Sequence, residues 1–219
     1  MSRPLLTDLD AAVAALERGR PVLVHDGDDR EHEVDLLYPA RAVAPGDVAR
    51  LRHDAGGLLF VALPDAVART FDLPFLHEAV DHPATEYDHV GYDARPSFSL
   101  SVNHRTTYTG VTDADRSRTI RALAAAAAAP EATDFAAEFR APGHVHLLRG
   151  APGGLTSRQG HTELGLALAA EAEGVAAIAG CEMLDDASGG ALDPRDARRY
   201  AREHDLVYLE AADVIATLR

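Results

Sequence analysis

The sequence predicts an α+β fold in which one mixed sheet is flanked by helices and residues 1–219 form a single domain. The chain has 219 residues, and 47% of them are hydrophobic, which is ample for the core of one domain. Short apolar runs typical of strands alternate along the whole chain with longer runs typical of helices. Neither an internal repeat nor a domain linker interrupts this alternation.

Helix signals recur at regular intervals. Thr7 is a typical N-cap residue, and Gly19 is a typical stop for the helix that follows it. Proline at a first helical position indicates further helices at Pro45, Pro64 and Pro194, the last after a capping aspartate. An alanine-rich run marks another, since alanine is the best helix former. Helices are expected at residues 8–18, 45–55, 64–71, 113–129 and 162–173, from residue 194 onward, and at 211–218.

Apolar runs between these helices indicate strands. In one of them Phe98, Leu100 and Val102 alternate with serines and Asn103, which predicts a half-buried strand with the serines and Asn103 on its polar face. The segment 72–96 shows little periodicity and is expected to be a long loop. Strands are expected at residues 21–25, 34–38, 57–63, 97–103, 144–148, 175–179 and 206–209.

The composition excludes several kinds of site. Cys181 is the single cysteine, so neither an intrachain disulfide nor a cysteine-based zinc site is possible within this sequence. All 21 basic residues are arginine, which excludes a lysine Schiff base. The net charge of −14 argues against nucleic acid as a partner, because no basic stripe is available to replace phosphate counterions.

The sequence also indicates where the protein is found. The chain opens without a charged-then-apolar leader and has no apolar run of about 18 or more residues. We therefore expect a soluble, cytoplasmic protein that enters no membrane. An acidic, lysine-free, alanine-rich chain further indicates a halophilic source, an inference about habitat only.

An acidic stretch joins two of the predicted strands. Residues 26–35 hold six carboxylates together with Arg30 and His32. Crowded carboxylates repel one another unless a cation or an arginine neutralises them, and Mg²⁺ prefers oxygen ligands of this kind. A solvated acidic turn is the alternative, because runs of like charge are usually just exposed.

A second polar stretch, residues 156–163, joins a glycine-rich loop to a predicted helix start. Backbone N–H groups at a helix N-terminus bind anions, commonly phosphate. Arg158 adds a bidentate donor and Thr162 a hydroxyl. His161 is a candidate metal ligand or base, although a lone histidine at a helix start is more often a cap or a surface residue.

Two further candidates lie at strand ends. His144 begins a predicted strand, where a structural histidine is the usual case. Glu182 follows another strand, where active-site residues collect in open sheets, although a solvent-facing turn is the alternative.

Taken together, the motifs resemble those of a known family. The acidic stretch at 26–35 is followed, in order, by Gly-Val-Thr-Asp-Ala-Asp-Arg at 110–116, Arg-Ala-Pro-Gly-His-Val at 140–145, the loop at 156–163 and Cys-Glu at 181–182. In order and spacing these motifs resemble the 3,4-dihydroxy-2-butanone 4-phosphate synthase family of riboflavin biosynthesis, over nearly the whole chain.

The resemblance implies a lyase that converts D-ribulose 5-phosphate to L-3,4-dihydroxy-2-butanone 4-phosphate and formate, using Mg²⁺, with Mn²⁺ as a possible substitute. It implies a homodimer with active sites near the subunit interface, and metal binding by Glu31 and His161. The substrate contacts carried over by position are Arg30, Glu31, Asp35, Thr109, Arg158, Gln159, Gly160, His161, Thr162 and Glu182. The residues carried over for proton transfer are Asp26, Glu33, His144 and Glu182.

The sequence departs from the family pattern at four positions: His32, Val34, Phe60 and Gln159. None removes an expected ligand, but His32, Val34 and Gln159 bear on how the two loops close. Some relatives carry a fused cyclohydrolase domain with cysteine-bound zinc. This chain is too short for one and has a single cysteine, so we expect a monofunctional protein.

Two other functions remain open on the sequence. A magnesium-dependent sugar-phosphate isomerase or epimerase would use the same residues and stop at the enediol, so formate release separates it from the synthase. A non-catalytic acidic binding module would gain no thermal stability from Mg²⁺ or ribulose 5-phosphate.

Overall fold

A mixed sheet organises the fold. The computed structural model describes residues 7–27, 30–86, 91 and 93–219. Within these residues seven strands form one sheet in the order β4-β5-β3-β6-β2-β1-β7. The β1–β7 and β3–β5 pairs are parallel and the other pairs are antiparallel. The strands are β1 (Val22–His25), β2 (Val34–Pro39), β3 (Phe60–Leu63), β4 (Phe98–His104), β5 (Phe139–Arg149), β6 (Ile178–Glu182) and β7 (Val207–Glu210).

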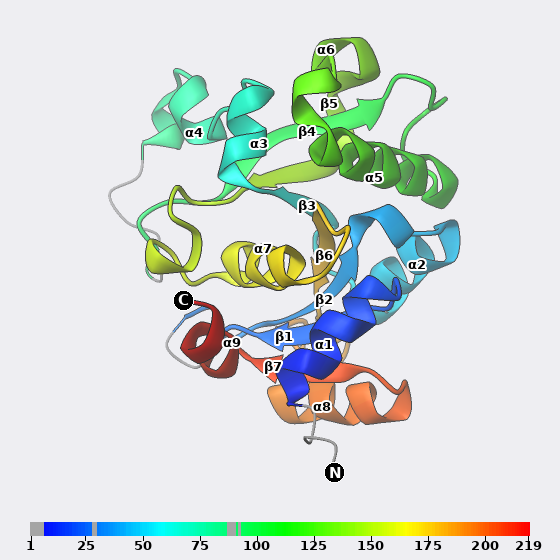
Figure 1. Ribbon diagram of the computed structural model, residues 1–219, viewed down its shortest axis with the longest axis vertical. Helices are drawn as coiled ribbons and strands as arrows, with labels where there is room; N and C mark the ends of the chain where they lie inside the picture. Colours follow the sequence, from blue (N-terminus) through cyan, green and yellow to red (C-terminus); the bar gives the residue numbers. More distant parts are fainter. Residues whose placement is uncertain (1–6, 28–29, 87–90, 92) are drawn as a thin grey trace.

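Helices cover both faces of this sheet (Figure 1). They are α1 (Asp8–Glu17), α2 (Pro45–Arg50), α3 (Asp65–Thr70), α4 (Leu76–Ala79), α5 (Asp113–Ala128), α6 (Phe135–Glu138), α7 (His161–Glu171), α8 (Pro194–Glu203) and α9 (Ala211–Leu218). The helices α1, α7 and α9 share one apolar cluster with one face of the sheet, and α2, α5 and α8 share another with the opposite face. The predicted mixed sheet flanked by helices is therefore confirmed.

Alternation along the central strands divides the two clusters. In β2, Leu36 packs on the α5 side and Leu37 on the α7 side. Asp35 is two residues from Leu37, so it shares the α7 face. This face is the one on which the candidate site is built.

Local signals placed several helix ends correctly. Thr7 and Asp10 form a reciprocal capping box at the start of α1, with hydrogen bonds of 3.1 Å in each direction. Asp193 caps α8 through the amide of Arg195. The helix α5 begins at Asp113, as expected, and Thr112 is its capping residue.

Other boundaries differ from the expectation. The strand β5 has 11 residues rather than the five expected at 144–148. The strand β3 begins at Phe60 and not at residue 57, and β6 ends at Glu182 and not at Ala179. Apolar runs flanked by small residues carry no mark of where pairing starts, because pairing depends on the neighbouring strand.

The segment 72–96 is not structureless as far as it is described. It contains α4 and a 3₁₀ turn, Pro83–Thr85. The ring of Phe75 lies beneath the guanidinium groups of Arg95 and Arg149, at 3.5 and 4.5 Å from the ring centre. Residues 87–90 and 92 of the expected loop, and residues 28 and 29 of the acidic stretch, lie outside the described residues.

The expected facing of strand β4 holds for Leu100 and Val102, which pack in the cluster on the α5 side, but fails for Phe98 and for the polar residues. Phe98 is 38% exposed, whereas Ser99 and Asn103 are buried. The backbone of Gly143 lies against Val102 and Asn103, and register shifts interrupt the β4–β5 pairing. The irregular register moves polar side chains to the inside, which an alternation pattern does not anticipate.

Among the described residues, no helix is long and apolar enough to cross a bilayer.

Candidate active site

The acidic stretch folds back on itself at the end of β1. Asp26 is 3% exposed and accepts hydrogen bonds from the amides of Glu31 at 3.0 Å and Glu33 at 3.1 Å. These bonds hold the two following glutamates near the start of β2. Among the described residues of the stretch, Asp26 is therefore buried and hydrogen-bonded between two strands and is not part of a solvated turn.

Three side chains from this turn and from α7 converge. Ligand atoms of Asp26, Glu31 and His161 all lie within 4.8 Å of one another. His161 is the first residue of α7 and is 6% exposed. Its Nδ1 lies 3.6 Å from a Glu31 oxygen, and its Nε2 lies 3.7 Å from Oδ1 of Asp35.

The donor set fits a divalent cation. It offers carboxylate oxygens, which Mg²⁺ prefers, and one imidazole nitrogen. Oδ1 of Asp35 is buried and has no hydrogen-bond partner among the described residues. A buried carboxylate oxygen without a partner is costly, and a cation nearby would remove that cost.

The carboxylates set the charge of His161. Burial disfavours the imidazolium, but Asp35, Glu31 and Asp26 outweigh it and raise the pKa of His161 to about 9. Burial alone would raise the pKa of Glu31, yet the hydrogen bond and charge of His161 prevail and lower it.

The other carboxyl groups are shifted the opposite way. Burial raises the pKa of Asp35 well above its usual value, and the charge of His161 offsets only part of this. Burial, and then the charge of Glu31, raise the pKa of Glu33. Burial also raises the pKa of Glu182. Carboxyls with raised pKa values beside an ionised one are candidates for proton transfer.

Glu182 is positioned by its strand and by Gly57. It pairs with Asp35 across β6 and β2, and its Oε2 accepts a 2.7 Å hydrogen bond from the amide of Leu58. A Cβ atom at Gly57 would lie 2.5 Å from that same oxygen, so only glycine allows this approach.

His144 lies on β5 and Glu182 on β6, with β3 between these two strands. Leu58, just before β3, lines a cavity with His144, and its amide donates to Glu182. His144 and Glu182 line different cavities.

Asn103, which the alternation pattern placed on an exposed face, orients His144. Its Oδ1 accepts from the amide of His144 at 2.9 Å, and its Nδ2 lies 3.1 Å from the imidazole Nδ1. The same Nδ2 donates to the carbonyl of Thr109 at 3.4 Å. His144 and Thr109 therefore form a second group of candidate residues, apart from Glu31 and His161.

The glycine-rich loop supplies the cationic part. Arg158 pairs with Asp93 at 2.5 Å and with Glu163 at 2.7 Å, and Glu163 in turn accepts from the amide of Ala151. A Cβ atom at Gly160 would lie 2.5 Å from the Arg158 guanidinium, so the loop backbone packs directly beneath it. Gln159 lies beside Arg158 in the lining of a cavity of about 220 Å³.

A small cavity joins these parts. Its volume is about 90 Å³, and its lining includes Glu31, Asp35, Arg158, His161, Thr162 and Glu182. Six of the ten expected substrate contacts thus line this cavity. Arg30 and Gln159 line the 220 Å³ cavity that Arg158 also lines, and Gly160 packs against Arg158, whereas Thr109 lies apart. The departures are accommodated here as well: Phe60 lines this cavity and packs against the bare backbone of Gly180, and Val34 is fully buried.

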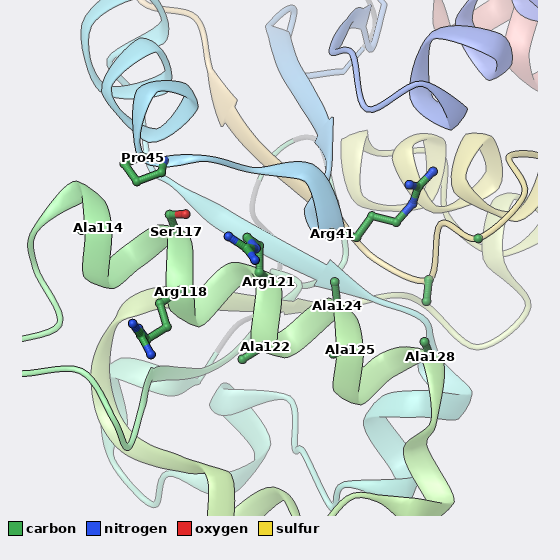
Figure 2. Close-up of a pocket in the computed structure, with 12 residues that line it drawn as sticks. Arg41, Pro45, Ala114, Ser117, Arg118, Arg121, Ala122, Ala124, Ala125 and Ala128 are labelled. Atoms are coloured by element: carbon green, nitrogen blue, oxygen red, sulfur yellow. The ribbon is translucent and has the colours of Figure 1, made fainter.

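A larger cavity of about 700 Å³ lies elsewhere, beside α5 (Figure 2). Alanines and three arginines (Arg41, Arg118 and Arg121) form much of its lining, and it contains no carboxylate or histidine among its lining residues. The volume of a cavity therefore does not identify the candidate active site. The convergence of ionisable side chains identifies it.

Three residues of the site were not anticipated: Asp93, Asn103 and Glu163. Asp93 lies in a segment without periodicity, and Asn103 in a strand of irregular register. Glu163 stood in the quoted loop motif without a role. Glu163 lies five residues after Arg158, with the start of a helix between them. No sequence pattern identifies an ion pair at that spacing.

The fold and the site together define a class: a mixed α/β protein whose carboxylates and histidine suit a divalent cation, next to an arginine-bearing loop at a helix start. Residues 10–217 match the sequence model of 3,4-dihydroxy-2-butanone 4-phosphate synthase. The chain belongs to the 3,4-dihydroxy-2-butanone 4-phosphate synthase family.

Curated relatives support this placement. A protein of Methanosarcina mazei named 3,4-dihydroxy-2-butanone 4-phosphate synthase is 41% identical, over 95% of this chain and 90% of its own length. A Mycobacterium avium protein named riboflavin biosynthesis protein RibBA is 35% identical, over 96% of this chain but 46% of its own length.

Solved structures agree. A 3,4-dihydroxy-2-butanone 4-phosphate synthase in complex with two magnesium ions superposes with a TM-score of 0.82 and 29% identity, covering 97% of this chain and 96% of that one. The two-domain synthase RibBX of A. baumannii gives a TM-score of 0.80 at 29% identity, covering 95% of this chain and 56% of that one.

Proposed function

We propose that this protein converts D-ribulose 5-phosphate to L-3,4-dihydroxy-2-butanone 4-phosphate and formate, a lyase reaction of riboflavin biosynthesis. The observation that carries the proposal is the cavity where Glu31, His161 and Glu182 meet Arg158, in a chain of this family. The two products together contain all the atoms of the substrate, so the reaction needs no co-reactant.

Glu31 and His161 would hold Mg²⁺, and Asp26 is placed to join them. Bound there, the ion supplies Lewis acidity towards hydroxyl and carbonyl oxygens of the substrate. Mn²⁺, which also accepts carboxylate ligands, is proposed as a substitute. Both oxygens of Asp26 already accept backbone N–H groups. We therefore propose that Asp26 shapes the turn and helps to hold the cation. This role is favoured over the proton transfer that the family resemblance implied for Asp26.

The arginines and the loop would bind the phosphate. Arg158 and Arg30 offer guanidinium groups, and the start of α7 offers backbone N–H groups beside the buried Thr162. Gln159 and Gly160 complete the loop. Asp35 lines the cavity between this loop and Glu182, where it would contact the sugar hydroxyls.

Proton transfer would fall to Glu182, Glu33 and His144. The reaction requires removal of a proton from carbon, loss of a hydroxyl as water, a shift of the carbon skeleton, and release of formate by addition of one water, which balances the water lost earlier. Glu182 lines the cavity and its carboxyl has a raised pKa, so it can act as base and then as acid. His144 is held by Asn103 through Nδ1, which leaves Nε2 to exchange protons.

A homodimer is proposed as the working assembly. Tyr108 is 93% exposed and Val111 is 51% exposed, and both flank Thr109 near His144. An apolar pair so close to candidate substrate contacts is a surface that a second copy would cover. This supports active sites near a subunit interface.

The finer attributes are proposed on the same basis. Residues 1–219 are proposed to form one synthase-like domain, which the family match over residues 10–217 supports. The acidic, lysine-free composition supports a halophilic source. A cytoplasmic location is proposed because the family is one of biosynthetic enzymes.

The test is incubation with ribulose 5-phosphate and Mg²⁺, followed by a formate assay and analysis of the sugar phosphates. Formate together with a four-carbon phosphate is expected. Interconversion of pentose phosphates without formate would instead identify an isomerase or epimerase.

A further inference from the structure

Asp93 contacts both arginines that are proposed to receive the substrate's phosphate. Its Oδ2 lies 2.5 Å from Nε of Arg158 and 3.1 Å from a terminal nitrogen of Arg30. Its Oδ1 accepts from the amide of Ala94 at 2.7 Å. One carboxylate oxygen therefore bridges two guanidinium groups that come from different loops.

This arrangement resembles the way a phosphate oxygen is bound. Guanidinium groups recognise carboxylates and phosphates with the same N–H donors and similar geometry. The side chains involved are enclosed, with 16% of Arg30, 11% of Arg158 and 11% of Asp93 exposed. Arg30, Asp93 and Arg158 together line the cavity of about 220 Å³, so Asp93 occupies N–H donors that a phosphate in this cavity would need.

The surrounding charge makes simultaneous occupancy unfavourable. Asp26 lies 3.8 Å from Arg30, and the buried Glu163 lies 2.7 Å from Arg158. With Asp93 these are three carboxylates around two guanidinium groups. A phosphate dianion added to them would meet net repulsion, and removal of Asp93 from the contact would relieve it.

The space available points the same way. Pro96, Ser97 and Phe98, a few residues after Asp93, line the 90 Å³ cavity that contains Glu31 and His161. Ligand pockets typically measure about 300–1,000 Å³, so a pentose phosphate needs this lining to move outward. Release of Asp93 would free the segment that carries it.

We propose that Asp93 is an internal competitor of the substrate's phosphate group for Arg30 and Arg158. The inference rests on the proposed function only in assigning these two arginines to the phosphate. Phosphate displaces the Asp93 carboxylate, so binding of the correct ligand is coupled to opening of the segment from Asp93 to Phe98. Asp93 acts through the two arginines and is therefore a positioning residue.

The test measures binding of inorganic phosphate by calorimetry to the full-length wild type, Asp93→Asn, Asp65→Asn and Arg158→Ala. Asp65 is a matched control, because its side chain is also 11% exposed and pairs with an arginine, Arg149, at 2.8 Å. Both asparagine variants remove one negative charge. Folding of each variant is checked by thermal unfolding.

Asp93→Asn is expected to bind phosphate at least about threefold more tightly than the wild type. The reason is that no carboxylate then competes with phosphate for the N–H groups of Arg30 and Arg158. Its KM for ribulose 5-phosphate is expected to fall by a similar factor, and Asp65→Asn is expected to match the wild type. Unchanged or weaker phosphate binding by Asp93→Asn, with Arg158→Ala losing binding, would overturn the competitor role and leave the proposed function intact. Equal binding by Arg158→Ala and the wild type would overturn the phosphate site itself, whatever the formate assay shows.

Discussion

Nε2 of His161 lies 3.7 Å from Oδ1 of Asp35, a buried oxygen that has no hydrogen-bond partner among the described residues. The pair joins the first turn of α7 to the β2 strand, and Glu31 approaches the other imidazole nitrogen. The centre of the proposed site is therefore a histidine between carboxylates, built from segments that are far apart in the sequence.

Glu31→Gln and His161→Ala are expected to abolish formate release while the protein stays folded, because each removes a proposed cation ligand. Thermal unfolding with and without Mg²⁺ checks the reason: the wild type gains stability from the ion and the variants lose that gain. Turnover like that of the wild type in both variants at limiting Mg²⁺ would rule out the ligand assignment.

Glu182→Gln and His144→Ala are expected to behave differently. Both should still be stabilised thermally by ribulose 5-phosphate with Mg²⁺, yet release formate about 10²–10⁴-fold more slowly, the usual contribution of a general acid or base. Lost ligand stabilisation would assign them to binding instead. Rates within about tenfold of the wild type would exclude acid–base roles.

Gly57→Ala is expected to lower both stability and activity. The added Cβ would lie 2.5 Å from Oε2 of Glu182 and 2.7 Å from its carbonyl oxygen. The β6 strand or the Glu182 side chain must therefore shift, which lowers the free energy of unfolding by about 1–3 kcal/mol. Gly46→Ala is the control, since nothing lies within 4 Å of a Cβ there. Chemical denaturation and the formate assay measure the difference. Equal effects of the two changes would argue against close packing at Gly57.

Tyr108→Glu is expected to convert a dimer to monomers and to reduce activity. A charge at a side chain that is 93% exposed costs little in the monomer but a great deal in an apolar interface. Sedimentation of the wild type and the variant measures the change. A dimer that persists in the variant would place the interface elsewhere.

The melting temperature is expected to rise with potassium chloride from millimolar to molar concentration. A net charge of −14 destabilises the compact state through self-repulsion, and salt screens this repulsion. Calorimetry over the salt series measures it. A flat or falling curve would contradict a halophilic adaptation.

The sequence anticipated what depends on neighbouring residues. Thr7 and Asp193 cap their helices, and the acidic stretch joins β1 and β2 as expected. The meeting of Glu31 with His161, 130 positions later, followed only from family resemblance, because no local pattern relates two elements so far apart. The fold had to supply that contact.

The features that were missed depend on tertiary contacts. The alternation pattern places Asn103 on the polar face of its strand. In the structure, the backbone of Gly143 lies against β4 and the register is shifted, and Asn103 is buried beside His144. Asp93 stands in a segment with no periodicity, and only the positions of Arg30 and Arg158 give it a role. Side chains whose partners come from distant loops cannot be assigned by spacing.

The stoichiometry of formate release tests the central claim most directly. With ribulose 5-phosphate and Mg²⁺, the account predicts one formate for each pentose phosphate consumed, and none after the metal is removed with a chelator. Consumption of ribulose 5-phosphate without formate, or formate release unaffected by the chelator, would contradict it.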